Sequence, residues 1–579
     1  MNDALQQLLD RLTALLAEKP LIGAWYTTVV RFVFPLLALM ILVGAIRSLW
    51  KVKHPDEVWG YLVLRNGVRL PITHWENIIG RAPSCDVQLE YPSVSRQHAA
   101  LIREDDGSWT IYDLGSKGGI KVNDLPVDEY ALVEDGDTVT FAGIPAIMEP
   151  ITAEEKRAQM VERRIEGKPA GMWGSLVLLT LFQILTGLQL IIAQGDKATT
   201  TIPLTFFVFT VICWAYFIVM RLFRRIGFEM ETIAFFLCTL SLAVTGSTVP
   251  DELPKQLIAI LMGLAIFIVL GFFLRDLTRA QKVRWFMSAT AVGLLAITLL
   301  IGSSQGGAKA WLRLGPLSLQ TSEIAKICYI FAGAATLDRL FNKRNLWMFI
   351  GLTAICGGCL ALQNDFGTAL VFFVTFLVIA YLRSGDFATI GLVCAGCFGA
   401  GMVMLTIKPH VAARFASWGH IWEDVYDKGF QQTHTLTAAA SGGMIGGKGW
   451  LSNLPAADTD IVFGMLCEEW GLVIAVLTIL CIITLAVFAV RACRAGRSSF
   501  YTIAACAATS LLVFQTCLNV FGAVDILPFT GVTLPFVSNG GSSMLSAWGM
   551  LAFLKATDTR QNASFAVRLP SRRELRGEE

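Results

Sequence analysis

The chain has 579 residues, of which 54% are hydrophobic and only 16% are charged. A soluble globular domain carries nearer a quarter of charged residues, so this composition excludes a single soluble domain and indicates a protein of the lipid bilayer. The formal net charge of +2 gives no overall field that would attract nucleic acid, and we expect no nucleic acid partner. Most of the 13 cysteines lie in apolar runs without ligand-like neighbours, and we assign no metal site to them.

The N-terminal part of the chain predicts a surface helix followed by a membrane anchor. Leucines recur at helical spacing within residues 1–27, which is typical of an amphipathic helix that lies on a surface. Residues 28–50 are apolar except for Arg31 and provide the ~20 residues that a bilayer core requires. The length of this span and the missing small-residue cleavage site argue against a removable signal peptide.

Residues 57–150 differ in kind from the segments around them. Short β-rich runs such as YLVLR, NIIGR and TVTFAG alternate with turn residues, which predicts a small all-β sandwich. A charged linker follows over residues 151–172. Two apolar segments at 173–222 and those within 229–557 then bring the total to about 13 spans, before a polar tail at 558–579. The expected fold is a polytopic all-α membrane protein with an inserted β-sandwich.

Basic residues distinguish the two sides of the predicted bundle. Clusters at 221–225, 275–282, 339–344 and 491–497 fall on one side when the spans are counted alternately, and the excess of Lys and Arg in cytoplasmic loops makes that side the cytosol. The same parity places the β domain inside the cell and the long connection 408–460 outside. Because function concentrates in long loops, we expect the working face at the outer surface of the cytoplasmic membrane.

The β insert carries four short motifs in a recognisable order. They are Gly80-Arg81, Ser95-Arg96-Gln97-His98, Tyr112-Asp113-Leu114-Gly115-Ser116 and Val122-Asn123. Together they resemble a forkhead-associated (FHA) domain across almost the whole insert. The resemblance implies that Arg81 and Ser95 contact the phosphate of a phosphothreonine protein, with Arg96 and Lys117 beside them, while His98 braces the loop. A guanidinium and a hydroxyl offer charge-assisted donors to phosphate oxygens.

One position of the insert departs from that family's pattern. Gly118 stands where FHA domains usually carry an asparagine that grips the peptide backbone. Two interpretations therefore stay open, a phosphothreonine-binding domain and a docking module that keeps the fold without the ligand.

The membrane half carries a run of motifs in fixed order. They lie at residues 308–315, 320–326, 363–369, 429–431, 441–449, 454–463, 468–472 and 534–543. Together they resemble the SEDS family, the FtsW, RodA and SpoVE proteins of division, elongation and sporulation, over about residues 229–557. The resemblance implies an inverting glycosyltransferase that polymerises peptidoglycan strands from lipid II.

Asp460 carries the catalytic prediction, because it matches the family's catalytic aspartate at the outer end of the span that follows the large loop. Joining a sugar hydroxyl to an anomeric carbon that bears a polyprenyl diphosphate needs a base for the hydroxyl and cations for the diphosphate. The diphosphate already leaves well, so one carboxylate suffices and the paired carboxylates of glycosidases are not expected. By position alone a helix-capping role would be favoured, and only the family match reverses this.

Further residues complete the predicted substrate site. The cations on the outer side are Lys309, Arg313, Arg414 and Lys448, and the sequence does not separate those that bind diphosphate from those that do not. Glu323 and Lys326 lie three apart on one helix face, so they form either a local ion pair or part of the site. The resemblance adds four residues to the predicted set, namely Gln320, Asp365, Ser542 and Ser543.

Several residues depart from the usual pattern of the SEDS family. Asp458 stands where a histidine is usual, and Asn539 stands where a tyrosine is usual. A second carboxylate beside Asp460 would raise the basicity of the pair or attract a divalent cation, Mg or Mn, together with the diphosphate. No other cofactor is expected.

Three functions remain open from the sequence. The first is the glycosyltransferase, with a class B penicillin-binding protein, a single-span transpeptidase, as the partner that the resemblance implies. The second is a lipid II flippase, because many spans with intramembrane charges can also form a transport path. The third is a non-catalytic scaffold whose FHA-like domain recruits phosphoproteins to the envelope.

Overall fold

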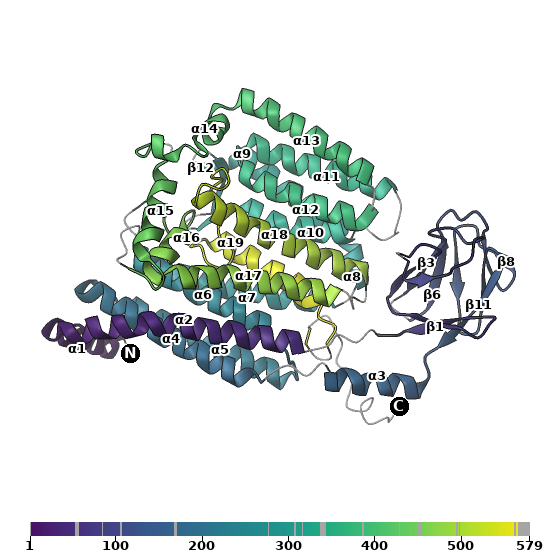
Figure 1. Cartoon of the computed structure of the whole chain (residues 1–579), viewed down its shortest axis with the longest axis horizontal. Helices are drawn as coiled ribbons and strands as arrows, with labels where there is room; N and C mark the ends of the chain where they lie inside the picture. Colours follow the sequence, from purple (N-terminus) through teal and green to yellow (C-terminus); the bar gives the residue numbers. More distant parts are fainter. Residues whose placement is uncertain are drawn as a thin grey trace.

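The computed structural model shows a helical bundle with a β domain beyond one of its ends (Figure 1). The residues described are 2–51, 57–83, 85–104, 107–166, 171–275, 277–305, 308–314, 317–335, 343–384, 387–427, 429–447, 454, 456–493, 496, 498–560 and 563–564. Helices α14 (Pro409–Ser417) and α15 (Phe430–Gly442) lie at the end of the bundle away from the β domain (Figure 1). The expected fold, a polytopic helical protein with an inserted β-sandwich, is confirmed.

The β domain consists of two sheets packed face to face. One sheet has the order β2-β1-β11-β10-β7-β8 and the other the order β4-β3-β5-β6-β9, with antiparallel pairing except between β3 and β4. Alternating residues such as Leu62, Ile79 and Phe141 fill the core between the sheets. The strands are β1 (Gly60–Leu64), β2 (Arg69–Ile72), β3 (Glu76–Gly80), β4 (Val87–Gln88), β5 (Ala99–Arg103), β6 (Trp109–Asp113), β7 (Ile120–Val122), β8 (Leu125–Pro126), β9 (Tyr130–Val133), β10 (Thr138–Phe141) and β11 (Ile144–Pro150).

By length and composition, 11 helices in the described part of the chain could cross a membrane. They are α2 (Pro20–Lys51), α4 (Met172–Gln194), α5 (Thr201–Leu222), α6 (Glu229–Thr248), α7 (Leu253–Phe273), α9 (Arg284–Ile301), α11 (Lys343–Leu362), α12 (Phe366–Ser384), α13 (Phe387–Ile407), α17 (Leu472–Cys493) and α18 (Ser499–Ala523). The two other predicted spans correspond to α10 (Thr321–Ala335) and α19 (Gly541–Ala556), which are shorter in the described residues and deeply buried. Helices α6 and α19 form the centre of the bundle, because nearly all their side chains are buried.

Shorter elements connect the spans. The charged linker forms α3 (Ala153–Glu166), and α8 (Leu277–Lys282) precedes α9. Single turns of 3-10 helix occur at Gly195–Lys197, Pro250–Glu252 and Ile421–Glu423. A three-stranded antiparallel sheet, which the sequence did not predict, is formed by β12 (Ser303–Gln305), β13 (Ala308–Leu314) and β14 (Leu317–Gln320).

Two predicted element boundaries lie elsewhere in the structure. Helix α1 (Asn2–Glu18) ends before Pro20, where α2 begins, so the break between surface helix and span is not at residue 27. The span expected over 462–490 is divided into α16 (Val462–Met465), a π-helical turn (Leu466–Trp470) and α17. Gly471 separates the last two with φ +87°, and a Cβ there would lie 2.4 Å from the carbonyl oxygen of Met444, so only glycine fits.

Helix α18 connects the β domain to the opposite end of the bundle. The Glu76 carboxylate of β3 accepts hydrogen bonds from the backbone N–H of Ser499 (2.9 Å) and from its hydroxyl, at the first turn of α18. Asn519, near the other end of α18, contacts the backbone of Asp460. At 1.5 Å per residue these two contacts are about 30 Å apart, the thickness of a bilayer core. The β domain and Asp460 therefore lie at opposite ends of a membrane-spanning helix.

A buried ion cluster ties the β-domain end of the bundle together. Arg560 donates to both carboxylate oxygens of Glu229 (3.0 and 3.1 Å) and to Asp558 (2.6 Å), and Glu229 also accepts a hydrogen bond from Ser48 of α2. Lys555 pairs with the buried Glu231 of α6. The predicted tail at 558–579 thus begins as a buried segment, and its residues after 564 lie outside the described part.

Replacing Arg560 with methionine should destabilise the fold strongly. The substitution leaves Glu229 and Asp558 as buried carboxylates without their cation, and breaking a buried pair in this way costs about 3–5 kcal/mol. The measurement is chemical or thermal unfolding of the purified protein in detergent. Lys255→Met removes an exposed partner of Glu252 and should change stability by less than about 1 kcal/mol. Equal effects of the two variants would contradict the structural role of the cluster.

Candidate active site

Asp460 ends a series of turns just before α16, and its backbone is held on two sides. Its N–H donates to Ala456 (3.0 Å), and its carbonyl oxygen accepts from Nδ2 of Asn519 (2.9 Å). Gly531, at φ +67°, lies against the carboxylate, since a Cβ there would be 3.5 Å from Oδ2. The N-cap of α16 is Ile461, without a side-chain cap hydrogen bond, so Asp460 does not cap this helix. Its half-buried carboxylate is left for other partners.

The surroundings of Asp460 make it a stronger base than a free aspartate. Burial raises the pKa of Asp460 from 3.8 to about 6, opposed by a hydrogen bond from Thr459 and the charge of Arg414, and reinforced by the charge of Asp458. With a pKa near 6 the carboxylate is ionised at neutral pH and basic enough to accept a proton from a hydroxyl.

Arg414 is the predicted cation that the structure places beside Asp460. It belongs to α14, its guanidinium is exposed, and Nη1 donates to the carbonyl oxygen of Thr530 (3.4 Å), the residue before Gly531. Because a guanidinium has five N–H donors, most of its capacity is free for an anion such as diphosphate.

A buried polar tract extends from Asp460 into the bundle. Asn519 and Gln515 lie four apart on one face of α18, and Gln515 donates to the backbone and hydroxyl oxygens of Thr533 (both 3.0 Å). Its amide oxygen accepts from Nζ of Lys326 (3.1 Å), which also pairs with Glu323 (2.7 Å). The ion pair considered for Glu323 and Lys326 therefore exists and is at the same time part of the tract.

The predicted residues Ser542, Ser543 and Gln320 adjoin this tract at the start of α19. The hydroxyls of Ser543 and Thr533 are hydrogen-bonded (2.7 Å), and the hydroxyl of Ser542 accepts from the N–H of Gln320 (2.9 Å). Asp365 lies close enough to interact electrostatically with Lys326 and Glu323, while one of its oxygens caps α12 through the N–H of Thr368.

Several buried oxygens of the tract have no hydrogen-bond partner among the described residues. They are Oε2 of Glu323, Oδ2 of Asp365, Oδ1 of Asn519 and Oγ1 of Thr530. Buried polar atoms are normally hydrogen-bonded, to protein or to ordered water. These oxygens are therefore positions at which water or the hydroxyls of a substrate can bind.

Three predicted cations are not joined to Asp460 by contacts of the described residues. Nζ of Lys309 donates to the carbonyl oxygens of Leu299 (2.8 Å) and Leu300 (3.2 Å), which caps the end of α9. Arg313 is exposed on β13. Lys448 lies outside the residues that the structure describes.

Sequence reasoning missed Gln515, Asn519 and Thr533. The signal was present, because Gln515 and Asn519 are polar, four residues apart and inside an otherwise apolar span. Thr533 stands in an irregular loop without helical spacing, and only its contacts with Gln515 and Ser543 reveal its place.

The two departures from the SEDS pattern near Asp460 contact each other. Nδ2 of Asn539 donates to Oδ2 of Asp458 (2.6 Å), and the N–H of Asn539 donates to the carbonyl oxygen of Asp458 (2.9 Å). Ser538 donates to the carbonyl oxygen of Thr459 (2.7 Å). Residues 458–460 are thus held against the turn that precedes α19.

A metal site is not preformed in the described part of the chain. No group of three or more His, Cys, Asp or Glu residues is placed there to hold an ion. Asp458 and Asp460 could each supply an oxygen ligand, and the diphosphate oxygens and water would have to supply the rest. Mg or Mn at this site stays a prediction.

The predicted phosphate-binding residues of the β domain surround Ser95. The N–H of Arg81 donates to the carbonyl oxygen of Ser95 (3.0 Å), and the N–H of Lys117 donates to its hydroxyl (3.1 Å). Arg81, Arg96 and Lys117 are all exposed. His98 is fully buried, and its Nδ1 accepts from the N–H of Ser95 (3.1 Å), so its Nε2 carries the proton donated to Gly119 (3.2 Å).

The structure explains why Gly118 replaces the usual asparagine. A Cβ at this position would lie 2.3 Å from Cβ of Ala142, a distance that no side chain tolerates. The loop between β6 and β7 therefore packs directly on the turn between β10 and β11, in space that an asparagine side chain would need.

Comparison with known proteins assigns a family to the membrane half of the chain and to its β domain. A family model for FtsW, RodA and SpoVE, described as cell cycle proteins, matches residues 214–563, and an FHA domain model matches residues 77–142. The chain is 31% identical over 325 residues to the peptidoglycan glycosyltransferase RodA of Mycobacterium tuberculosis (strain ATCC 25618 / H37Rv), covering 52% of this chain and 69% of the relative. It is 30% identical over 324 residues to the probable peptidoglycan glycosyltransferase FtsW of Pseudoalteromonas translucida, covering 52% and 81%.

Among solved structures, one similar chain comes from a study of the structural coordination of polymerization and crosslinking by a peptidoglycan synthase complex. It shares 27% identity with a TM-score of 0.48, over 57% of this chain and 98% of that chain.

The family model takes in the whole tract around Asp460, whereas α2, α4 and the β domain precede it. The chain is a multi-pass membrane protein that belongs to the FtsW, RodA and SpoVE family and carries an FHA domain ahead of the family core.

Proposed function

We propose that this chain is a peptidoglycan glycosyltransferase that polymerises lipid II at the outer face of the cytoplasmic membrane. The observation that carries the proposal is Asp460, a half-buried carboxylate with a raised pKa that lies beside Arg414 and at the end of a buried polar tract. The relatives along this core that are named peptidoglycan glycosyltransferases support the same reaction class.

In the proposed reaction Asp460 removes the proton from the acceptor sugar hydroxyl. The hydroxyl oxygen attacks the anomeric carbon of the donor from the side opposite the diphosphate, so a C–O bond forms with inversion while the bond to the diphosphate breaks. The polyprenyl diphosphate leaves with the bonding electron pair, and Arg414 stabilises its charge. The open oxygens of Glu323, Asp365 and Asn519 are suited to hold sugar hydroxyls during this step.

The proposed orientation rests on loop charge and on α18. The basic residues of 221–225 and Arg491 lie at the same ends of their spans as the β domain, which favours a cytosolic β domain. Asp460, at the other end of α18, then faces outward. A class B penicillin-binding protein is the transpeptidase partner we propose there, on the family resemblance alone.

Asp460→Asn should lower the rate of glycan polymerisation from labelled lipid II by about 10²–10⁴-fold, the usual contribution of a positioned base. The amide keeps the size of the side chain, so the fold should be intact. Polymer length and rate are read on gels of the labelled product. Asp427→Asn, an exposed aspartate of the same outer connection, should polymerise normally. Full activity of Asp460→Asn would refute the assigned base, whereas an absence of polymerisation by the wild type would leave the flippase or the scaffold as the explanation.

The pH dependence of kcat/KM should follow Asp460. The base acts only when ionised, so activity should fall as the pH drops through about 6. Asp458→Asn removes a like charge and should move this limb to lower pH, whereas Arg414→Gln removes an opposite charge and should move it to higher pH. Shifts of both variants in the same direction would exclude Asp460 as the titrating group.

The β domain is proposed to bind a phosphothreonine protein through Arg81 and Ser95. The full-length protein in detergent, titrated with phosphothreonine peptides, should bind them and not their unphosphorylated forms. Arg81→Ala should weaken binding by about 10–100-fold, because it removes a charge-assisted hydrogen bond to phosphate. Arg65→Ala, an exposed arginine elsewhere in the domain, should not. No binding at millimolar peptide would leave the docking module as the correct interpretation.

A further inference from the structure

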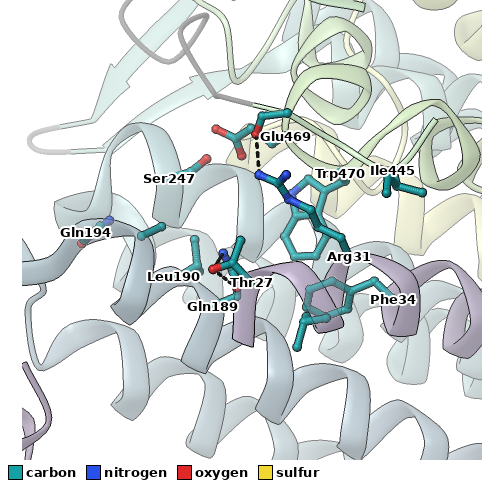
Figure 2. Close-up of a pocket in the computed structure, with 13 residues that line it drawn as sticks. Thr27, Arg31, Phe34, Gln189, Leu190, Gln194, Ser247, Ile445, Glu469 and Trp470 are labelled. Atoms are coloured by element: carbon teal, nitrogen blue, oxygen red, sulfur yellow. Dashed lines mark hydrogen bonds between the residues drawn. The ribbon is translucent and has the colours of Figure 1, made fainter. Parts of the chain in front are cut away.

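A cavity of about 320 Å³ lies between α2, α4 and the family core (Figure 2). Its walls include Arg31 from α2, Gln194 from α4, and Glu469 and Trp470 from the π-helical turn. Helices α2 and α4 precede the part of the chain that matches the family model. The cavity thus lies at the interface between the family core and the helices α2 and α4 that precede it. The proposed polymerisation does not involve this cavity.

Arg31 supplies the positive side of the cavity. It is the charge that interrupts the first apolar span, and such residues commonly mark a ligand or ion site. The guanidinium rises from α2 toward Glu469 (Figure 2), and its Nη2 donates to the carbonyl oxygen of Gly447 (3.2 Å). That is its one hydrogen bond within the described residues, so most of its five N–H donors remain for a ligand.

The facing wall supplies hydrogen-bond acceptors. Glu469 lines the cavity without an ion pair to Arg31 in the described structure, and its carboxyl has the hydroxyl of Ser247 as a partner. Gln194 donates through its amide nitrogen to Gly246, whereas its Oε1 is buried and has no partner among the described residues. The cavity therefore offers cationic donors on one side and the oxygens of a carboxyl and an amide as acceptors on the other.

The depth of the cavity matches the region where lipid headgroups meet acyl chains. Trp25, 69% exposed near the start of α2, is typical of the aromatic belt at a membrane interface. Arg31 lies about 9 Å further along the helix. Apolar side chains of the same two helices are exposed, such as Phe32 (62% exposed) on α2 and Ile184 (58% exposed) on α4. A ligand in this cavity can keep its chains in the bilayer.

We propose that the cavity binds the headgroup of a phosphoethanolamine lipid. The phosphate would accept from Arg31, and the ammonium would donate to Glu469 and to Oε1 of Gln194. A zwitterion satisfies both walls at once, whereas the anionic phosphatidylglycerol offers only neutral hydroxyls to the second wall and a quaternary ammonium has no N–H to donate. A lipid bound at this interface connects α2 and α4 to the core. The inference is independent of the proposed enzymatic activity.

The test is lipid retention by the full-length protein, measured by native mass spectrometry. Phosphatidylethanolamine, phosphatidylglycerol and phosphatidylcholine with identical acyl chains are supplied in equal amounts. The wild-type protein should retain phosphatidylethanolamine about tenfold over either of the others. Arg31→Gln should lower that retention about tenfold, and Glu469→Gln should reduce phosphatidylethanolamine to the level of phosphatidylcholine.

A matched control and a competitor complete the experiment. Arg47→Gln removes an exposed arginine of the same helix that does not line the cavity, and it should retain lipid like the wild type. Water-soluble glycerophosphoethanolamine at millimolar concentration should not displace the lipid. Equal retention of the three lipids by the wild type would overturn the proposal, even if a variant failed to fold. The proposal would also be overturned if both cavity variants kept the wild-type preference for phosphatidylethanolamine, or if the soluble headgroup displaced the lipid.

Discussion

A charged side chain inside a bilayer must find its counter-charge in the protein, and this requirement organises the molecule from one end to the other. At the β-domain end Arg560 is enclosed by Glu229 and Asp558, and the cluster fastens α2, α6 and the segment after α19 to one another. Further along, Lys326 is shared between Glu323 and Gln515. At the far end burial raises the pKa of Asp460, and the charge of the neighbouring Arg414 offsets this only in part. Each buried charge is paired within the protein where the fold depends on it. At Asp460 the pairing is incomplete, and a substrate can supply the missing partners.

Helix α18 gives this arrangement its geometry. One end receives Glu76 of the FHA domain, the middle carries Gln515, and the far end carries Asn519 beneath Asp460. The same helix therefore contacts the β domain, the buried tract and the loop of Asp460.

The departures from family patterns are explained by pairwise contacts. Asp458 and Asn539 both depart from the pattern and are hydrogen-bonded to each other through side chain and backbone, which holds the loop of Asp460 against the turn before α19. Gly118 is required because Ala142 occupies the space of a Cβ. In both cases the residue lacks a group that the family usually has at that position, and the contact with a neighbouring residue explains the residue found there.

Apolar segment length, β-rich alternation and ordered motifs were enough to predict the spans, the sandwich and both families, and to single out Asp460 as the candidate base, because these signals are local in the chain. The sequence could not predict the π-helical turn and Gly471, the sheet of β12, β13 and β14, or the role of Lys309 at the end of α9, since each depends on backbone that approaches from elsewhere. It also could not join Arg31 to Glu469, which are far apart along the chain and face one cavity only after α2 packs on the core. Hydrophobic pattern determines which segments enter the bilayer, whereas the pairing of their few polar groups is a property of the packed bundle.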